Sequence, residues 1–160
     1  MMKKLSLGIL LIACLAGCTN KAAFTYNEDF VKQEKVINKA ADEVDSRLQS
    51  YIDAEKYDSV QAISERMEKL IDGVTADVKA KPAPDVKEGS NFKDACIKYL
   101  GARKGYYTAF KEVAIASPEE RSQKIVDLGM VGIGLLSAVK DIQASQKKYA
   151  EANGFKIVDK

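Results

Sequence analysis

Few side chains in this sequence have the types and spacing that enzyme chemistry requires. The best candidate pair is Ser90 and Lys93, because a lysine one helical turn from a serine can help to activate its hydroxyl as a nucleophile. The Ser-Asp-Asn and Lys-Thr-Gly segments that accompany this pair in enzymes are both missing from the chain. We therefore interpret Ser90 as a helix cap and predict no catalytic residue.

The chain contains no histidine. This absence excludes Ser-His and Cys-His nucleophile pairs, metal sites that depend on imidazole, and the Glu-x-x-His di-metal motif of helical bundles. We therefore expect neither a metal nor another cofactor. The 25 basic and 23 acidic side chains are interspersed, which argues against nucleic acid as a partner, because phosphate binding requires clustered positive charge.

The N-terminal residues have the layout of a secretory signal. Lys3 and Lys4 precede an apolar run at residues 5–15, and the small residue Gly17 comes just before Cys18. The run is about 11 residues long, which is too short for a membrane-spanning helix of roughly 20 residues. Without these two lysines the acidic and basic side chains would balance, so the small positive charge belongs to the leader.

The segment Leu15-Ala16-Gly17-Cys18 resembles the lipobox of bacterial lipoproteins. The resemblance implies cleavage between Gly17 and Cys18 and acylation of Cys18 with chains such as palmitate, so that membrane lipid is the first partner. Thr19, rather than aspartate, follows the cysteine, and by the sorting rule of Gram-negative envelopes this points to the outer membrane. The alternative is an ordinary cleaved signal with a chance cysteine.

After processing, Cys96 would be the only free thiol, so no internal disulfide can form. Cys96 falls on the apolar face of a predicted helix together with Tyr99, Arg103 and Tyr106. We predict a buried, inert thiol and tyrosines whose hydroxyls reach the rim of the core. A redox role or an intermolecular disulfide is the alternative for Cys96.

Apolar residues recur at helical spacing along most of the chain, and no segment shows the alternation of a strand. Thr25 with Glu28, and Asp58, fit helix caps, and Ser117-Pro118 is a strong start signal. The pattern predicts helices at about 26–54, 59–79, 91–115 and 118–152. The expected organisation is a signal peptide at 1–17, a lipidated tether at 18–24, a helical domain at 25–154 and a tail at 155–160. We predict an all-α, antiparallel, up-down four-helix bundle.

The fourth predicted helix is unusually rich in glycine. Gly129, Gly132 and Gly134 lie inside an apolar segment, and each interior glycine costs about 1 kcal/mol relative to alanine. We expect close packing of the third and fourth helices through their small residues, with space for a ligand or a bend as the alternative. Val126, Met130 and Ile133 form a second apolar strip, either a face covered by the other helices, which we expect, or an association surface.

The whole layout resembles a family of small bacterial surface lipoproteins of unassigned function. The lipobox, the opening Thr25 to Phe30 and the glycine-rich segment carry this resemblance. It implies a lipid-anchored place in the cell envelope and a helical fold, but no activity. We expect a non-enzymatic, structural or protein-interaction module, with a protein partner or self-association through the fourth helix. The alternative is a carrier of an apolar small molecule or lipid between the helices.

Overall fold

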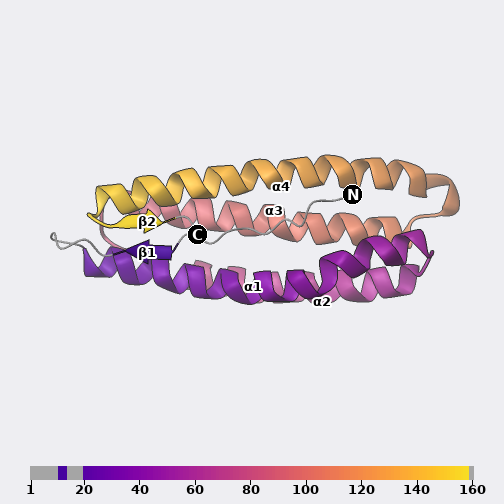
Figure 1. Cartoon of the computed structure of the whole chain (residues 1–160), viewed down its shortest axis with the longest axis horizontal. Helices are drawn as coiled ribbons and strands as arrows, with labels where there is room; N and C mark the ends of the chain where they lie inside the picture. Colours follow the sequence, from indigo (N-terminus) through magenta and orange to yellow (C-terminus); the bar gives the residue numbers. More distant parts are fainter. Residues whose placement is uncertain (1–10, 14–19, 159–160) are drawn as a thin grey trace.

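The computed structural model describes residues 11–13 and 20–158, with side chains from 20 to 157. Within this part of the chain most residues are helical, which confirms the predicted all-α class. The four helices lie side by side along one long axis, with connections at alternate ends (Figure 1). They are α1 (Lys21–Asp53), α2 (Tyr57–Ala80), α3 (Gly89–Ile115) and α4 (Pro118–Ala152).

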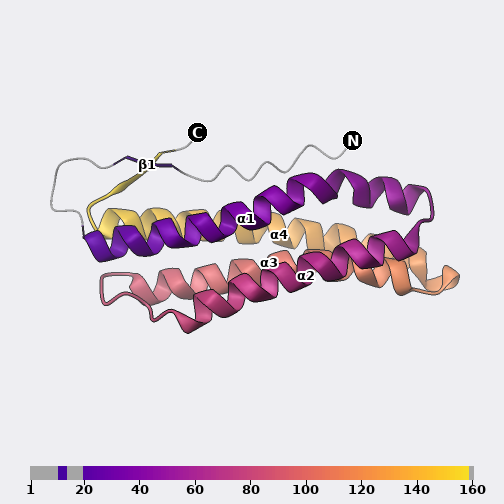
Figure 2. The same ribbon diagram turned by 90° about the horizontal axis from the view of Figure 1, so that it is seen from below.

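In the view of Figure 1, α1 and α2 lie below α3 and α4, and in the view of Figure 2, α1 and α4 lie above α2 and α3, so the four helices form a two-by-two bundle. Helix α3 packs extensively against α2 and α4, whereas α1 makes its main contacts with α2 and few with α4. The core contains large apolar side chains from all four helices and from the segment after α4. The largest buried residues include Ile37, Leu48, Met67, Ile71, Phe92, Tyr99, Leu100, Tyr107, Tyr149 and Phe155.

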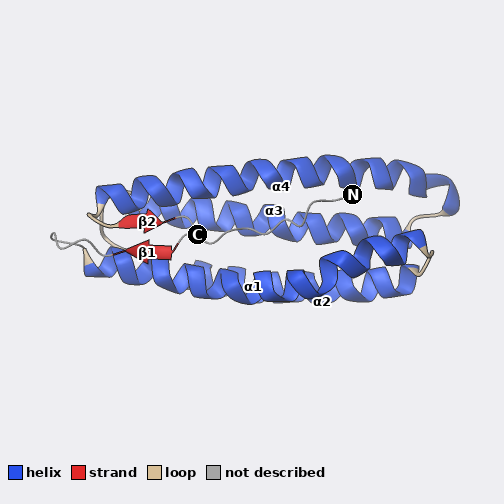
Figure 3. Cartoon of the chain, in the orientation of Figure 1, coloured by secondary structure: helices blue, strands red, loops and turns tan. Residues whose placement is uncertain are grey.

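Two short strands are an addition that the sequence did not predict. Strand β1 (Leu11–Ala13) pairs antiparallel with β2 (Lys156–Val158), with Ile12 opposite Ile157 (Figure 3). A pair of three-residue strands is too short to produce recognisable alternation in a sequence. β2 falls in the expected C-terminal tail, and β1 falls within the leader that we predict to be removed.

Helix α1 begins earlier than predicted, so part of the expected tether is helical. The side chain of Asn20 accepts hydrogen bonds from the backbone N–H groups of Ala22 and Ala23, at 3.1 and 3.2 Å, which caps the first turn. Residues 21–24 therefore belong to the helix. The predicted capping box at Thr25 is wrong, because Thr25 lies inside a helix that already has its cap.

Two further predicted caps are wrong. Lys56 is the N-cap of α2, so Asp58 lies in the first turn, where its charge favours the helix dipole. Glu88, at φ 61°, precedes α3, and Ser90 lies inside the helix. Gly89 is required at the first position, because a Cβ atom there would lie 2.2 Å from the carbonyl oxygen of Pro84.

Both predicted ends of α4 are confirmed. Ser117 is the N-cap and Pro118 the first helical residue, and the Ser117 hydroxyl donates to Glu120 Oε2 at 3.0 Å. Asn153 is the C-cap, and Gly154 follows at φ 75°, in the left-handed region that glycine adopts readily.

Candidate functional site

The most unusual surface of the described chain is an exposed apolar strip on α4. It consists of Ile125, Val126, Met130, Ile133 and Leu136, which we call the α4 strip. Val126, Met130 and Ile133 are 60%, 65% and 62% exposed. Of the seven large hydrophobic side chains that are exposed in the described residues, five belong to this strip, so it is a continuous patch and not a scatter of single residues.

This exposure corrects one expectation. We expected Val126, Met130 and Ile133 to face other helices of the same chain, and none of the described helices covers them. All five side chains of the strip are uncharged, and residues 128–139 contain no acidic or basic side chain. An uncharged apolar helix face of this kind is typical of a surface that another molecule covers.

The glycines of α3 and α4 do not serve the close packing that we predicted. A Cβ atom added at Gly101, Gly105, Gly129 or Gly134 would meet no atom within 4 Å. At Gly132 it would lie 3.8 Å from Cε2 of Tyr106, which is an ordinary van der Waals contact. The prediction of a close helix crossing through these residues is therefore wrong. Their cost in helix stability is not offset by any contact among the described residues.

Two of these glycines shape an open groove between α3 and α4. Small side chains line it, together with Val131, Leu135 and an ion pair between Lys98 and Asp141 at 3.3 Å. The small lining residues are Ala102, Gly105, Gly134, Ser137 and Ala138. The groove is open rather than enclosed. It therefore lacks the enclosed walls with which a carrier would bury most of an apolar ligand.

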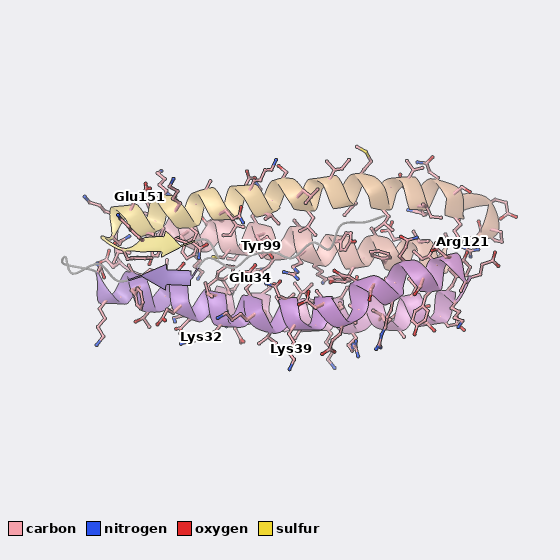
Figure 4. The ribbon with its side chains drawn as sticks, in the orientation of Figure 1. Lys32, Glu34, Lys39, Tyr99, Arg121 and Glu151 are labelled. Carbon is pink, nitrogen blue, oxygen red and sulfur yellow. The ribbon has the colours of Figure 1, made fainter. Side chains whose placement is uncertain are left out.

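A second feature, a buried polar cluster between α1 and α3, was not predicted. Tyr99 donates to Glu34 Oε1 at 2.9 Å, and Arg103 donates to the Tyr99 hydroxyl at 2.7 Å and to Asn38 Oδ1. Figure 4 shows Tyr99 and Glu34 between the two helices. One helical turn beyond Arg103, Tyr107 donates to Asp45 Oδ1 at 2.9 Å. We call these residues the polar cluster.

Burial determines the electrostatics of the polar cluster. Tyr99 and Tyr107 are each 1% exposed and Arg103 is 6% exposed. Desolvation raises the pKa of the Glu34 and Asp45 carboxyls, and hydrogen bonds from Tyr99 and Tyr107 offset it only in part. Burial alone would lower the pKa of Arg103, but the neighbouring Tyr99, Tyr107 and Glu34 outweigh it and raise that pKa.

The polar cluster has the character of a structural network. Arg103 Nη1 and the hydroxyls of Tyr99 and Tyr107 form hydrogen bonds within the cluster, which links α1 to α3, while the buried Nδ2 of Asn38 has no hydrogen-bond partner among the described residues. Such a network fixes the register of two helices, because a shift by one residue would leave buried polar groups unpaired. The sequence feature that could have indicated this cluster is Arg103, a charged residue on an otherwise apolar helix face.

The remaining candidates from the sequence lie apart from both features. Lys93 Nζ donates to the carbonyl oxygens of Lys79 and Lys81, at 2.9 and 2.6 Å, and so caps the end of α2, while Ser90 is exposed.

Cys96 is fully buried, and desolvation raises the pKa of its thiol well above the usual range, which confirms the prediction of a buried thiol. Burial also raises the pKa of Tyr106 to about 12.

The predicted cleavage and lipidation site, Gly17 and Cys18, lies outside the described residues. Among the residues that are described, no group of three or more histidine, cysteine, aspartate or glutamate side chains is placed to hold a metal ion. None of the helices described has both the length and the apolar character needed to cross a bilayer. No protein-family model, curated protein or solved structure matches the chain.

Proposed function

We propose that this protein is a lipid-anchored lipoprotein of the bacterial cell envelope, held in the outer membrane, and that it is a non-enzymatic interaction module. In this proposal its helices form an antiparallel, up-down bundle that presents the α4 strip to a protein partner. The observation that supports the proposal best is the exposure of the strip next to Gly129 and Gly134, where an added Cβ atom would meet no neighbouring atom of the described residues within 4 Å. Residues of this kind are unfavourable unless another molecule covers them.

The proposed anchor would hold the bundle close to the membrane. Only Thr19 and Asn20 separate Cys18 from the first residue of α1. Three residues of extended chain reach about 10 Å, so the beginning of α1 would lie near the lipid headgroups. A partner of the α4 strip would therefore have to be in the envelope as well.

The anchor can be tested by replacing Cys18 with serine in the native host. We expect the Cys18→Ser variant to leave the membrane fraction and to lack the added acyl mass, because the thioether-linked lipid can no longer form. Thr19→Ser is the matched control and should remain bound. If the serine variant stays firmly in the membrane, or if the native N-terminus carries no acyl chain, the anchor is wrong.

The interaction role requires a separate experiment. A photo-crosslinking amino acid is placed at Met130, in the centre of the α4 strip, and in a second variant at Lys39, which is exposed on α1 and points away from the bundle (Figure 4). We expect protein adducts in intact cells from position 130 and not from position 39. Adducts with lipid alone would favour the carrier, and equal labelling at both positions would contradict an interaction role for the strip.

A further inference from the structure

We propose that the α4 strip binds the α4 strip of a second copy of this chain, with the two helices antiparallel. This inference rests on the proposed interaction role of the strip and names its partner. It also accounts for the glycines, because a helix that packs against its own copy needs small residues opposite large ones.

The exposed side of α4 is complementary in shape to itself. A two-fold axis between residues 129 and 130 would place Met130 of one copy opposite Gly129 of the other. The same axis places Val126 opposite Ile133 of the second copy. The longest side chain of the strip thus meets the residue that has no side chain, and a Cβ-sized space is open there, since a Cβ atom added at Gly129 would meet no neighbouring atom within 4 Å. The apolar contact would extend over about 17 Å of helix.

The charges at the two ends of this face select the antiparallel arrangement. Glu119 and Lys140 are exposed on the same side of α4 as the strip, and among the described residues neither makes an ion pair. The two-fold axis places Glu119 of each copy opposite Lys140 of the other, which gives two ion pairs per dimer. A parallel arrangement would instead place like charges opposite each other at both ends.

The contact is short, so the dimer should be weak in dilute solution. Stable interfaces bury about 1,600 Å² in total, and a strip of about three helical turns is at or below the lower limit of that range. An anchor in a shared membrane would raise the local concentration of the chain and favour the dimer. The test is therefore carried out on the full lipoprotein in its native membrane.

Thiol crosslinking can report the geometry directly, because in the proposed processed lipoprotein Cys14 has left with the leader, Cys18 is acylated and the remaining thiol, Cys96, is buried. Glu119→Cys and Lys140→Cys variants with different tags are expressed together and treated with a short bismaleimide. We expect mixed 119–140 dimers. Homotypic 119–119 and 140–140 products should be absent, because an antiparallel pair separates those positions by about 31 Å. Homotypic products would show a parallel arrangement and overturn the inference.

A charge swap provides the second readout, independent of engineered cysteines. Glu119→Lys or Lys140→Glu alone should reduce the dimer fraction in lysine-directed crosslinking or sedimentation roughly fivefold, because each leaves like charges in contact at both ends. The double variant Glu119→Lys/Lys140→Glu restores both pairs with reversed sign and should return the dimer to within about twofold of the original. Failure of the double variant to recover would overturn the proposed register.

Met130→Arg places a charge in the centre of the strip and should abolish the dimer, while far-ultraviolet circular dichroism and the thermal unfolding midpoint stay unchanged, since residue 130 is exposed. A chain that is monomeric in its membrane overturns this inference. If position 130 then still captures a different envelope protein, the proposed interaction role survives and only the identity of its partner is wrong.

Discussion

Arg103 shows how a single charged side chain can be placed in a helical core. Its guanidinium donates to the Tyr99 hydroxyl and to Asn38, and the carboxyls of Glu34 and Asp45 supply opposite charge nearby. A buried charge is tolerated only when such partners replace the hydrogen bonds that water would make. The arrangement is unfavourable for the carboxyl groups of Glu34 and Asp45, because burial disfavours their charged forms and raises their pKa values.

The raised pKa of Glu34 predicts a dependence of stability on pH. Between its ordinary pKa and the raised value, the folded chain binds more protons than the unfolded chain, so the contribution of Glu34 to stability falls as pH rises. A Glu34→Gln variant does not titrate. We expect its free energy of unfolding, relative to the original chain, to increase as pH rises from about 4 through the raised pKa of Glu34, measured by urea denaturation.

Glu68 supplies a control of opposite sign for this experiment. Burial would raise the pKa of its carboxyl, but hydrogen bonds from Lys111 and Thr108 outweigh it and lower that pKa. Glu68 therefore stabilises the fold above its ordinary pKa, and this contribution is lost as pH falls. Glu68→Gln should therefore lose stability relative to the original chain as pH rises towards the ordinary glutamate pKa of about 4.3, below the range in which Glu34 acts. Slopes of the same sign for the two variants, each measured in its own pH range, would contradict both assignments.

Removal of Arg103 should be strongly destabilising. Arg103→Met keeps much of the side-chain volume but leaves Asn38 and the half-buried carboxyls of Glu34 and Asp45 without their cation. We expect the free energy of unfolding to fall by about 2 to 4 kcal/mol, because breaking a buried charged network leaves its other members unpaired. Arg66→Met is the matched control, since Arg66 is exposed on α2. A loss at Arg103 no larger than at Arg66 would show that the polar cluster is not structural.

At the scale of the helix, the glycines permit a test that distinguishes open space from close packing. Gly101→Ala should raise the free energy of unfolding by about 1 kcal/mol, because alanine favours helix and the added methyl group meets no other atom. Gly89→Ala should have the opposite effect, since its Cβ would collide with the backbone of Pro84. Thermal denaturation of both variants, each compared with the original chain, provides the measurement.

What could be predicted from the sequence differs between the helices for physical reasons. The limits of α4 follow from local signals, a serine and proline at its start and an asparagine and glycine at its end. The start of α1 was missed because Asn20 lies in a segment that composition suggested was a tether. Local patterns identify helices well when the signals that begin and end them are adjacent in sequence.

The polar cluster and the exposure of the α4 strip could not be predicted without knowing the fold. Glu34 and Tyr99 are 65 residues apart, so no local pattern connects them. The glycines and the apolar strip of α4 could be identified from the sequence. Which atoms surround these glycines in the folded chain could not. Whether a helix face is covered depends on where the other helices lie, and α1 makes few contacts with α4.

At the scale of the whole molecule, both ends of the helical domain meet at the same place. The N–H group of Asn20 donates to the carbonyl oxygen of Asn153 at 3.1 Å, and the Tyr149 hydroxyl donates to the carbonyl oxygen of Ala23 at 3.1 Å. Nearby, Phe92 stacks on Tyr149 with ring centroids 4.6 Å apart, and Phe155 contacts the edge of Tyr149. The end of the bundle that carries the proposed anchor is therefore its most aromatic end.

The position of the junction between Asn20 and Asn153 also limits how a dimer could be oriented on a bilayer. Along α4 the strip begins about 25 Å from this junction, and an antiparallel pair would place the two junctions about 70 Å apart, at opposite ends of the assembly. Because the proposed lipid on Cys18 lies within about 10 Å of the start of α1, the lipids of both copies can insert into one leaflet only if both bundles lie with their long axes parallel to the membrane. A molecule that paired in this way would coat the membrane rather than project from it.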